Sequence, residues 1–243
     1  MKFSLRDKVA IVTGGSSGIG AAIAAALGER GARVHILDVA DQAGVHVCDV
    51  SDQKAVNQVV EKIVVAEGRL DILVNNAGVG FVGNLEGTTE ADLDRLYAIN
   101  VKGVYNCALA CVPHLKERGG VILNMASVAA SVAVADRFAY SMTKGAVLTM
   151  TYSIAKDYLE YGIRCNSISP ARVHTPFVDA YLAKNYPGEE ADMFDRLSRT
   201  QPIGRMGRPG EIADLAVYLC SDEAAFVTGT DFPIDGGFIK LNG

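Results

Sequence analysis

The sequence has no excess of positive charge and no cysteine spacing typical of metal sites or disulfide frameworks. Its 23 lysine and arginine residues are outnumbered by 28 aspartate and glutamate residues, which gives a net charge of −5. Surfaces that bind nucleic acid cluster basic residues, so this balance argues against such a partner. The five cysteines form no Cys-x-x-Cys pair, and their odd number favours reduced thiols in the cytoplasm. No histidine or carboxylate cluster completes a site around Cys107 and Cys111, and we predict no metal.

Long hydrophobic runs and linker-like segments are also missing. No apolar stretch approaches the roughly 20 residues that a membrane-spanning helix needs. The N-terminal segment enters a glycine-rich turn after a short apolar run, so we expect neither a signal peptide nor an anchor. No repeat, low-complexity stretch or linker divides the 243 residues. With 49% hydrophobic and 21% charged residues, the composition is globular, and we predict one domain over residues 1–243.

What the sequence contains instead is a regular alternation of strand-like and helical segments. Short apolar runs predict seven strands, at Lys8–Thr13, Arg33–Leu37, Val45–Cys48, Leu70–Val74, Val121–Met125, Arg164–Ile168 and Asp231–Ile234. Helical periodicity predicts helices at Gly18–Arg30, Asp52–Ala66, Asp92–Lys116, Tyr140–Tyr161 and Pro209–Cys220. This order predicts an α/β fold of the Rossmann type, a doubly wound parallel seven-stranded sheet with helices on both faces.

Helix boundaries can be predicted as well. Gly31 is suited to end the first helix in a left-handed conformation, Ser51 to cap the second, and Pro209 to stand in the first turn of the last. Residues 39–44 are too few for a crossover helix between the second and third strands. We therefore expect that connection to lack a helix.

A glycine-rich turn joins the first expected strand to the first expected helix. Its sequence, Thr13-Gly14-Gly15-Ser16-Ser17-Gly18-Ile19-Gly20, permits a sharp turn and a close approach of a pyrophosphate to the helix amides. Glycines alone also fit a purely conformational role, but the strand before and the helix after favour a dinucleotide site. We predict cofactor contacts at Gly14, Ser16, Ser17, Gly18, Ile19 and Gly20.

The residue that ends the second strand indicates which dinucleotide is bound. Asp38 lies 18 residues beyond Gly20, where a carboxylate accepts hydrogen bonds from the adenosine ribose and repels a 2′-phosphate. Ser16 and Ser17 offer no positive charge to that phosphate. The sequence therefore predicts NAD over NADP, although an aspartate here can also simply end a strand and solvate a turn.

Further motifs follow in order along the chain. They are Asp49-Val50, Asn75-Asn76-Ala77-Gly78, Asn100, Ser127, Tyr140 with Lys144, and Ser169-Pro170. With the glycine turn, they make the sequence resemble the short-chain dehydrogenase/reductase family over essentially its whole length. The resemblance implies an NAD-dependent oxidoreductase that interconverts a secondary alcohol and a ketone. It also implies a homotetramer with the helices expected at 92–116 and 140–161 at one interface.

Tyr140 and Lys144 are spaced for acid–base chemistry. Four residues apart on one helix, they project from the same face. A tyrosine with an ordinary pKa of about 10 is a poor base near neutrality, but a nearby ammonium, with the positive ring of NAD⁺, stabilises the phenolate. Tyr140 is thus the expected general base and acid, and Ser127 is placed to hold the substrate oxygen. Each residue alone has a structural explanation; their combination beside the turn favours catalysis.

The resemblance implies further contacts. It assigns Lys144 to the nicotinamide ribose and Asn100 to a water in the proton relay. Other cofactor contacts that it implies are Asp49, Val50, Asn76, Ala77, Gly78, Pro170, Val173 and Thr175. The family usually has glycine where this chain has Ala171, so an unstrained backbone there requires a negative φ.

Residues 175–208 have a mixed helical pattern and are expected to fold over the cleft as a substrate lid. Polar residues in and around it favour a polyhydroxylated or carboxylated substrate. The candidate substrate contacts are Ser127, Arg137, Tyr140, Arg172 and His174. The stretch before Tyr140 and residues 162–166 resemble family members that act on sugar acids such as 2-keto-3-deoxy-fuconate, or on 3-hydroxybutyrate, and Arg137 would then pair with the carboxylate. A neutral sugar, fucose or rhamnose, is the alternative.

Functions of two other classes remain open. A dinucleotide-binding module without turnover would be marked by loss of Tyr140 or Lys144, and both are present. An epimerase or dehydratase of the extended relatives shares the turn and the tyrosine–lysine pair, but the short chain argues against their sugar-nucleotide domain. The apolar faces of the two interface helices fit either a subunit contact or packing on the sheet; their residues are Val101, Val104, Val147, Leu148 and Ile154.

Overall fold

Seven parallel strands form the centre of the molecule. The computed structural model describes residues 2–241. The strands are β1 (Val9–Thr13), β2 (Arg33–Asp38), β3 (Val45–Val47), β4 (Ile72–Asn75), β5 (Gly120–Met125), β6 (Ile163–Pro170) and β7 (Asp231–Ile234). They pair in the order β3-β2-β1-β4-β5-β6-β7. Chain order reverses between β1 and β4, and ligands of open α/β sheets bind in the crevice at such a point, outside the carboxyl ends of the strands. The predicted fold class is confirmed.

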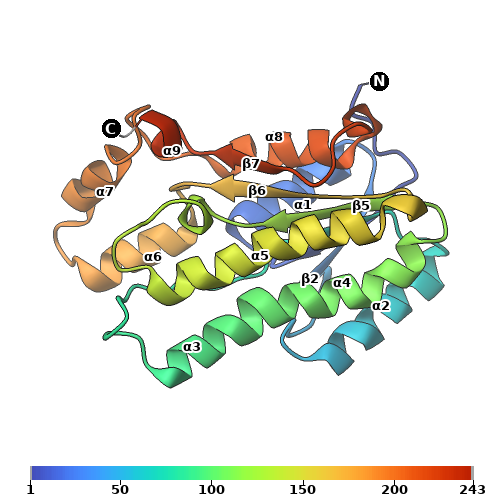
Figure 1. Cartoon of the computed structure of the whole chain (residues 1–243), viewed down its shortest axis with the longest axis horizontal. Coiled ribbons are helices and arrows are strands. Elements are labelled where there is room, and N and C mark those ends of the chain that lie inside the picture. Colours follow the sequence, from blue (N-terminus) through green and yellow to red (C-terminus); the bar gives the residue numbers. More distant parts are fainter. Residues whose placement is uncertain (1, 242–243) are drawn as a thin grey trace.

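Helices cover both faces of the sheet. They are α1 (Gly18–Glu29), α2 (Gln53–Glu67), α3 (Glu90–Leu96), α4 (Gly103–Leu115), α5 (Phe138–Asp157), α6 (Pro176–Asn185), α7 (Glu190–Ser198), α8 (Pro209–Cys220) and α9 (Phe238–Leu241). Side chains alternate between faces along a strand: Ala10 and Val12 pack with α1 and α8, and Val9 and Ile11 pack with α2 and α4. Figure 1 shows α6 and α7 together at one end of the molecule, near α9. No helix in residues 2–241 is both long and apolar enough to cross a membrane.

The expected elements are present, with boundary shifts of one or two residues at most strands. The β2–β3 connection has no helix, as predicted. Gly31, which follows the C-cap residue Arg30 of α1, has a φ of +97°, and Pro209 opens α8. The prediction that Ser51 caps α2 is wrong. The cap is Asp52, whose carboxylate accepts hydrogen bonds from two first-turn amides at 2.9 and 3.2 Å, because an aspartate one residue later reaches the same orphan donors.

The single helix expected at 92–116 is interrupted. A π-helical turn, Tyr97–Lys102, joins α3 to α4, and within it the amide of Gly103 bonds to the carbonyl of Ala98, five residues back. Such single π turns within α-helices often occur at functional sites. This one places the side chain of Asn100 in the interior. Helix α9 was not predicted, because four residues are too few to show a helical period.

A histidine pair lies at the edge of the sheet, and we expect it to make the stability depend on pH. His35 of β2 and His46 of β3 lie 3.1 Å apart through their ring nitrogens, and His35 also contacts Glu67 at 2.9 Å. Burial, followed by the charge of His35, lowers the pKa of His46. The folded protein therefore binds fewer protons at His46 than the unfolded chain. The stability that neutral His46 contributes is present above about pH 6.5 and is lost as the pH falls below that value.

We expect the free energy of unfolding to decrease between about pH 7 and pH 5, and to decrease less in a His46→Phe variant. Urea unfolding at several pH values measures the effect. The matched control is His114→Phe on α4, which should keep the wild-type pH dependence. An unchanged dependence in His46→Phe would contradict this role for the pair.

Candidate active site

The glycine turn lies at the carboxyl end of β1, where the strand order reverses. Gly14 and Gly18 have φ values of +63° and +54°, a conformation that favours glycine. Ser17 precedes α1 without capping it through its side chain, so the first amides of α1 are left for another acceptor. A Cβ on Gly20 would overlap the carbonyl oxygen of Gly14. Gly20 therefore lets the helix approach the turn closely.

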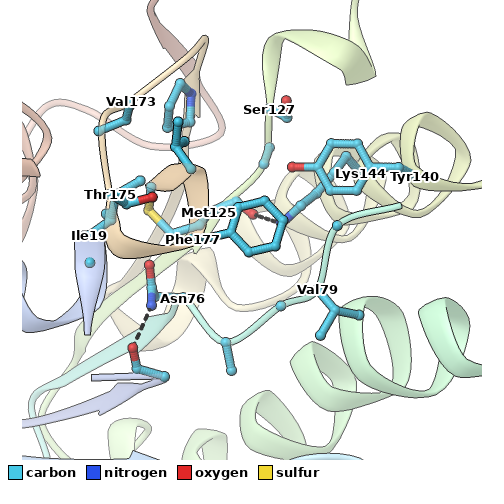
Figure 2. Close-up of a pocket in the computed structure, with 18 of the residues that line it drawn as sticks. Ile19, Asn76, Val79, Met125, Ser127, Tyr140, Lys144, Val173, Thr175 and Phe177 are labelled. Atoms are coloured by element: carbon cyan, nitrogen blue, oxygen red, sulfur yellow. Dashed lines mark hydrogen bonds between the residues drawn. The ribbon is translucent and has the colours of Figure 1, made fainter. Parts of the chain in front are cut away.

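Asn76, which directly follows β4, forms hydrogen bonds with the glycine turn. Its side-chain amide donates to the carbonyl oxygens of Thr13 and Gly14 at 3.1 and 3.0 Å. The hydroxyl of Thr13 accepts from the amides of Asn76 and Ala77, both at 3.0 Å. Figure 2 shows one hydrogen bond of the Asn76 side chain as a dashed line, in the cavity that Ile19 and Thr175 also line. Asn76, a predicted cofactor contact, thus also has a structural role that the sequence did not reveal.

Two carboxylates lie at the β2–β3 side of the sheet. Asp38 accepts hydrogen bonds from the amides of Ser16 and Ala40, at 3.0 and 3.3 Å, one on each oxygen. A carboxylate oxygen can accept more than one bond, so both oxygens can still receive a hydroxyl. Asp49 follows β3 and lines the same cavity as Asp38.

Ser127, Tyr140 and Lys144 lie together at the carboxyl end of β5. The hydroxyl of Ser127 lies near the phenol of Tyr140 and acts to lower its pKa. The Lys144 ammonium is buried, donates to the carbonyl oxygen of Met125 at 2.7 Å, and lies 5.9 Å from the centroid of the Tyr140 ring. Figure 2 shows the oxygens of Ser127 and Tyr140 on the same side of the cavity. The arrangement joins a proton donor–acceptor to a second hydroxyl that can hold a carbonyl oxygen.

Desolvation dominates the ionisation of this group. It raises the pKa of Tyr140, while the nearby hydroxyl of Ser127 and the charge of Arg137 act in the opposite direction. It also lowers the pKa of Lys144 to about 8. In this structure, the positive charge that lowers the pKa of Tyr140 comes from Arg137, whereas the sequence pointed to Lys144. The reason is that burial lowers the pKa of Lys144 and raises that of Tyr140, so Lys144 loses its proton at a lower pH than the phenol does.

The side chain of Asn100 is engaged by its neighbours. Its Oδ1 accepts from the amide of Val79 at 2.8 Å, and its Nδ2 donates to the carbonyl of Val79 at 2.9 Å and to the hydroxyl of Thr143 at 3.1 Å. Both amide hydrogens are therefore used. Asn100 ties the loop after β4 to α5, and a relay water, which stays a prediction, would have to meet mainly the backbone of the π-helical turn.

The predicted lid forms α6 and α7 and supplies one wall of the cavity. Phe177, at the start of α6, reaches the loop after β4: a Cβ on Gly80 would meet the Phe177 ring at 3.3 Å. His174, a predicted substrate contact, is directed elsewhere. It bonds to Asp179 at 2.8 Å and packs edge-on against Phe194, with 4.9 Å between ring centroids.

These elements enclose one cavity of about 620 Å³. Most predicted site residues line it: Gly14, Ser17, Gly18, Ile19, Asp38, Asp49, Val50, Asn76, Ala77, Gly78, Ser127, Arg137, Tyr140, Lys144, Pro170, Arg172, Val173 and Thr175. Four do not: Ser16, Gly20, Asn100 and His174. Apolar residues that also line the cavity were not predicted from the sequence, among them Phe81, Phe177, Met206 and Phe238. They lie in loops or short helices, where no periodic pattern marks them. Ala171 has no positive φ, as predicted.

The cavity fits an extended dinucleotide. Asp38 ends β2 and Ser127 follows β5, three strand spacings apart, or about 14 Å. The glycine turn lies between them, with helix amides open to a diphosphate. Asp38 lines the same cavity and can accept hydrogen bonds from a ribose. Asp38, the helix amides and Ser127 thus follow one another along the cavity in the same order as the adenosine ribose, the diphosphate and the reacting end of the dinucleotide.

Comparison with known proteins agrees with this geometry. The family model described as Enoyl-(Acyl carrier protein) reductase matches residues 14–239. The 2-keto-3-deoxy-L-fuconate dehydrogenase of Xanthomonas campestris pv. campestris is 36% identical, over 96% of this chain and 81% of that protein. The ligand-free aldohexose dehydrogenase AldT of Thermoplasma acidophilum has a TM-score of 0.91 and 35% identity, covering 96% of this chain and 94% of the other. ElxO with NADP bound has a TM-score of 0.89 and 27% identity, covering 96% and 99%. The chain therefore belongs to the short-chain dehydrogenase/reductase family of oxidoreductases.

Proposed function

We propose that the protein is an NAD(H)-dependent dehydrogenase that interconverts a secondary alcohol and a ketone. The observation that carries the proposal is that the glycine turn and the neighbouring hydroxyls of Ser127 and Tyr140 line one cavity. The turn offers amides to a diphosphate, and the pair offers a proton acceptor and a hydrogen-bond donor to one substrate oxygen. A protein that only binds a dinucleotide does not need the Ser127 and Tyr140 hydroxyls in the same cavity.

The residues divide the proton chemistry between them. In alcohol oxidation, the phenolate of Tyr140 takes the hydroxyl proton while the hydroxyl of Ser127 donates to the substrate oxygen. The positive charge of Arg137 favours the phenolate. Oxidised nicotinamide, when bound, supplies the hydride acceptor. In ketone reduction, the phenol of Tyr140 returns the proton to the same oxygen.

We propose NAD as the cofactor because of the charges around the expected ribose. The acidic residues that line the cavity are Asp38 and Asp49, at the ends of β2 and β3. The basic residues that line it come after β5 or β6 in the chain, and they are Arg137, Lys144 and Arg172. A Cβ on Gly15 would lie 2.8 Å from the side chain of Ile36, so the turn has no room for a basic side chain at that position. One structural relative holds NADP; hence the family alone does not decide the cofactor.

The proposed substrate is a small sugar or sugar acid. Two relatives are named for such substrates, 2-keto-3-deoxy-L-fuconate and an aldohexose. A 3-hydroxybutyrate-type hydroxy acid is the second candidate, because two arginines line the cavity near Tyr140. The five cysteines are free and buried, which fits the reducing cytoplasm that we propose as the location.

A coupled assay of NADH formation with aldoses, aldonates and hydroxy acids tests the proposed function. We expect NAD⁺-dependent oxidation of at least one of them. NADH binding without turnover of any alcohol would point to a binding module. Conversion of a sugar nucleotide without net change in NADH would point to an epimerase.

We further propose a homotetramer with α4 and α5 at one interface. The apolar helix faces that the sequence suggested for this interface are buried within the chain itself. Val101, Val104, Val147 and Leu148 are buried, and Ile154 packs on the sheet core. They cover the sheet. Other apolar residues are exposed on these helices, namely Tyr105, Leu109, Met142 and Tyr152. Such an exposed apolar surface is typical of a protein–protein contact.

Leu109→Arg should convert the tetramer to smaller species, because it buries an unpaired charge in the proposed interface. Size-exclusion chromatography with light scattering measures the mass. Val65→Arg on α2, at a residue that is 74% exposed, is the matched control and should remain tetrameric. A monomeric wild-type protein would rule the proposal out.

A further inference from the structure

Two arginines line the cavity beside Tyr140, and no acidic residue in the described part of the chain pairs with either. Arg137 immediately precedes α5, and Arg172 follows β6. Both are half-buried. Among the residues that the structure describes, neither forms an ion pair with a carboxylate, whereas three other arginines do. Unpaired charges are costly to bury, so this pair requires an explanation.

Each guanidinium is held along one edge by a neutral group. Arg137 donates through Nη1 to the carbonyl of Phe81 at 2.9 Å, and Arg172 donates through Nε to the hydroxyl of Thr200 at 3.0 Å. A guanidinium carries five N–H donors in a rigid plane. One bond to a neutral acceptor fixes its orientation and leaves other donors for a ligand. The two side chains are therefore oriented before any ligand binds.

The two charges also lie close enough to act on each other. Burial, followed by the charge of Arg137, lowers the pKa of Arg172. Both charges reach Tyr181 of α6, where each opposes a rise in the pKa of that phenol. Like charges held together in a half-buried site repel each other. An anion bound between them would relieve this repulsion.

The distribution of charge in the cavity favours an anion on this side. Its acidic lining residues are Asp38, which ends β2, and Asp49, which follows β3. Strands β1 and β4 lie between them and β5, the strand that Ser127 follows. A negatively charged substrate is thus attracted toward the reacting groups and repelled from the expected adenosine end. A neutral sugar would gain nothing from this arrangement.

We propose that Arg137 and Arg172 together form a carboxylate subsite, so that the substrate is a hydroxy acid or oxo acid and not a neutral sugar. The choice of substrate rests on the proposed function, but the anion site does not. Arg137 lies three residues before Tyr140, within one turn of helix. The carboxylate and the reacting carbon therefore belong to one short molecule, as in a sugar acid or a 3-hydroxy acid.

Binding of malonate, compared with its uncharged diamide malonamide, tests the subsite without turnover. With NADH present and ionic strength held constant, a tenfold excess of malonate over its Kd should raise the melting temperature by about 3 °C. Malonamide should give no rise. The rise should disappear in Arg137→Met/Arg172→Met and persist in Arg196→Met, which removes an exposed arginine of α7. Equal responses in the wild type and the double variant would overturn the subsite.

Two pairs of acid and neutral compounds test the substrate class. They are acetoacetate with its methyl ester in NADH oxidation, and L-fuconate with L-fucose in NAD⁺ reduction. For at least one pair, kcat/KM for the acid should exceed that for the neutral partner by about 10²-fold. This ratio should fall toward one in Arg172→Met and stay unchanged in Arg196→Met. Equal or better use of both neutral partners by the wild type would overturn the inference.

The two experiments separate failure of the inference from failure of the proposed function. Malonate binding through both arginines without oxidation of any alcohol would leave the subsite standing and remove the dehydrogenase proposal. Oxidation of neutral sugars without malonate binding would leave the dehydrogenase proposal standing and remove the subsite.

Discussion

Replacing Tyr140 with phenylalanine should lower kcat for alcohol oxidation by about 10³-fold while NADH still binds. The variant keeps the ring and its packing but loses the oxygen that exchanges a proton with the substrate. Ser127 keeps its own bond from the amide of Ala129, at 3.2 Å, so the loop after β5 should hold its shape. Steady-state kinetics measure the loss of turnover, and NADH fluorescence measures binding.

Tyr152→Phe is the matched control for this variant. Tyr152 lies on the same helix, α5, and is exposed, so its phenol cannot serve the cavity. The control should retain wild-type kcat. If Tyr140→Phe retained wild-type kcat as well, another group would have to move the proton, and the assignment of the base would be wrong.

The parts of this site that the sequence predicted depend on short-range spacing. Tyr140 and Lys144 share a helix face because they are four residues apart, and the glycine turn is recognised by the strand and the helix that flank it. Asp38 was found by its distance from that turn. The seven strands were visible because both faces of a parallel sheet are buried, which makes each strand a continuous apolar run.

Contacts between distant segments were not predictable in this way. Asn76 bonds to the end of β1, more than 60 residues earlier, and nothing near either residue indicates the partner. The π-helical turn at Asn100 depends on interior contacts with Val79 and Thr143. The dominance of desolvation over the charge of Lys144 likewise depends on how the chain closes around it.

His174 illustrates how a residue next to the site can point away from it. Val173 and Thr175 on either side line the cavity. In an extended backbone, neighbouring side chains point to opposite sides, and Thr175 is extended, with φ −139° and ψ 163°. His174 therefore points to Asp179 and Phe194. Sequence proximity alone predicted a contact that the direction of the side chain does not make.

Asp38→Asn should lower the preference for NAD over NADP by about 10²-fold. A carboxylate about 5 Å from a phosphate charge is repelled by about 3 kcal/mol at an effective dielectric constant near 20, and the change to asparagine removes this repulsion. Asparagine retains one acceptor oxygen for the amide of Ser16, which Asp38 binds at 3.0 Å, so the turn should keep its shape. The ratio of kcat/KM values for the two cofactors, measured with one substrate, gives the effect.

Asp41→Asn is the matched control, because it removes the same charge three residues further along the chain, at an exposed position outside the cavity. It should leave the cofactor ratio within about threefold of the wild type, since water and salt screen the charge of an exposed residue. If both variants shifted the ratio equally, the preference would come from the overall negative charge of the protein and not from a contact of Asp38. If neither did, the selection between NAD and NADP would have to lie elsewhere in the cavity.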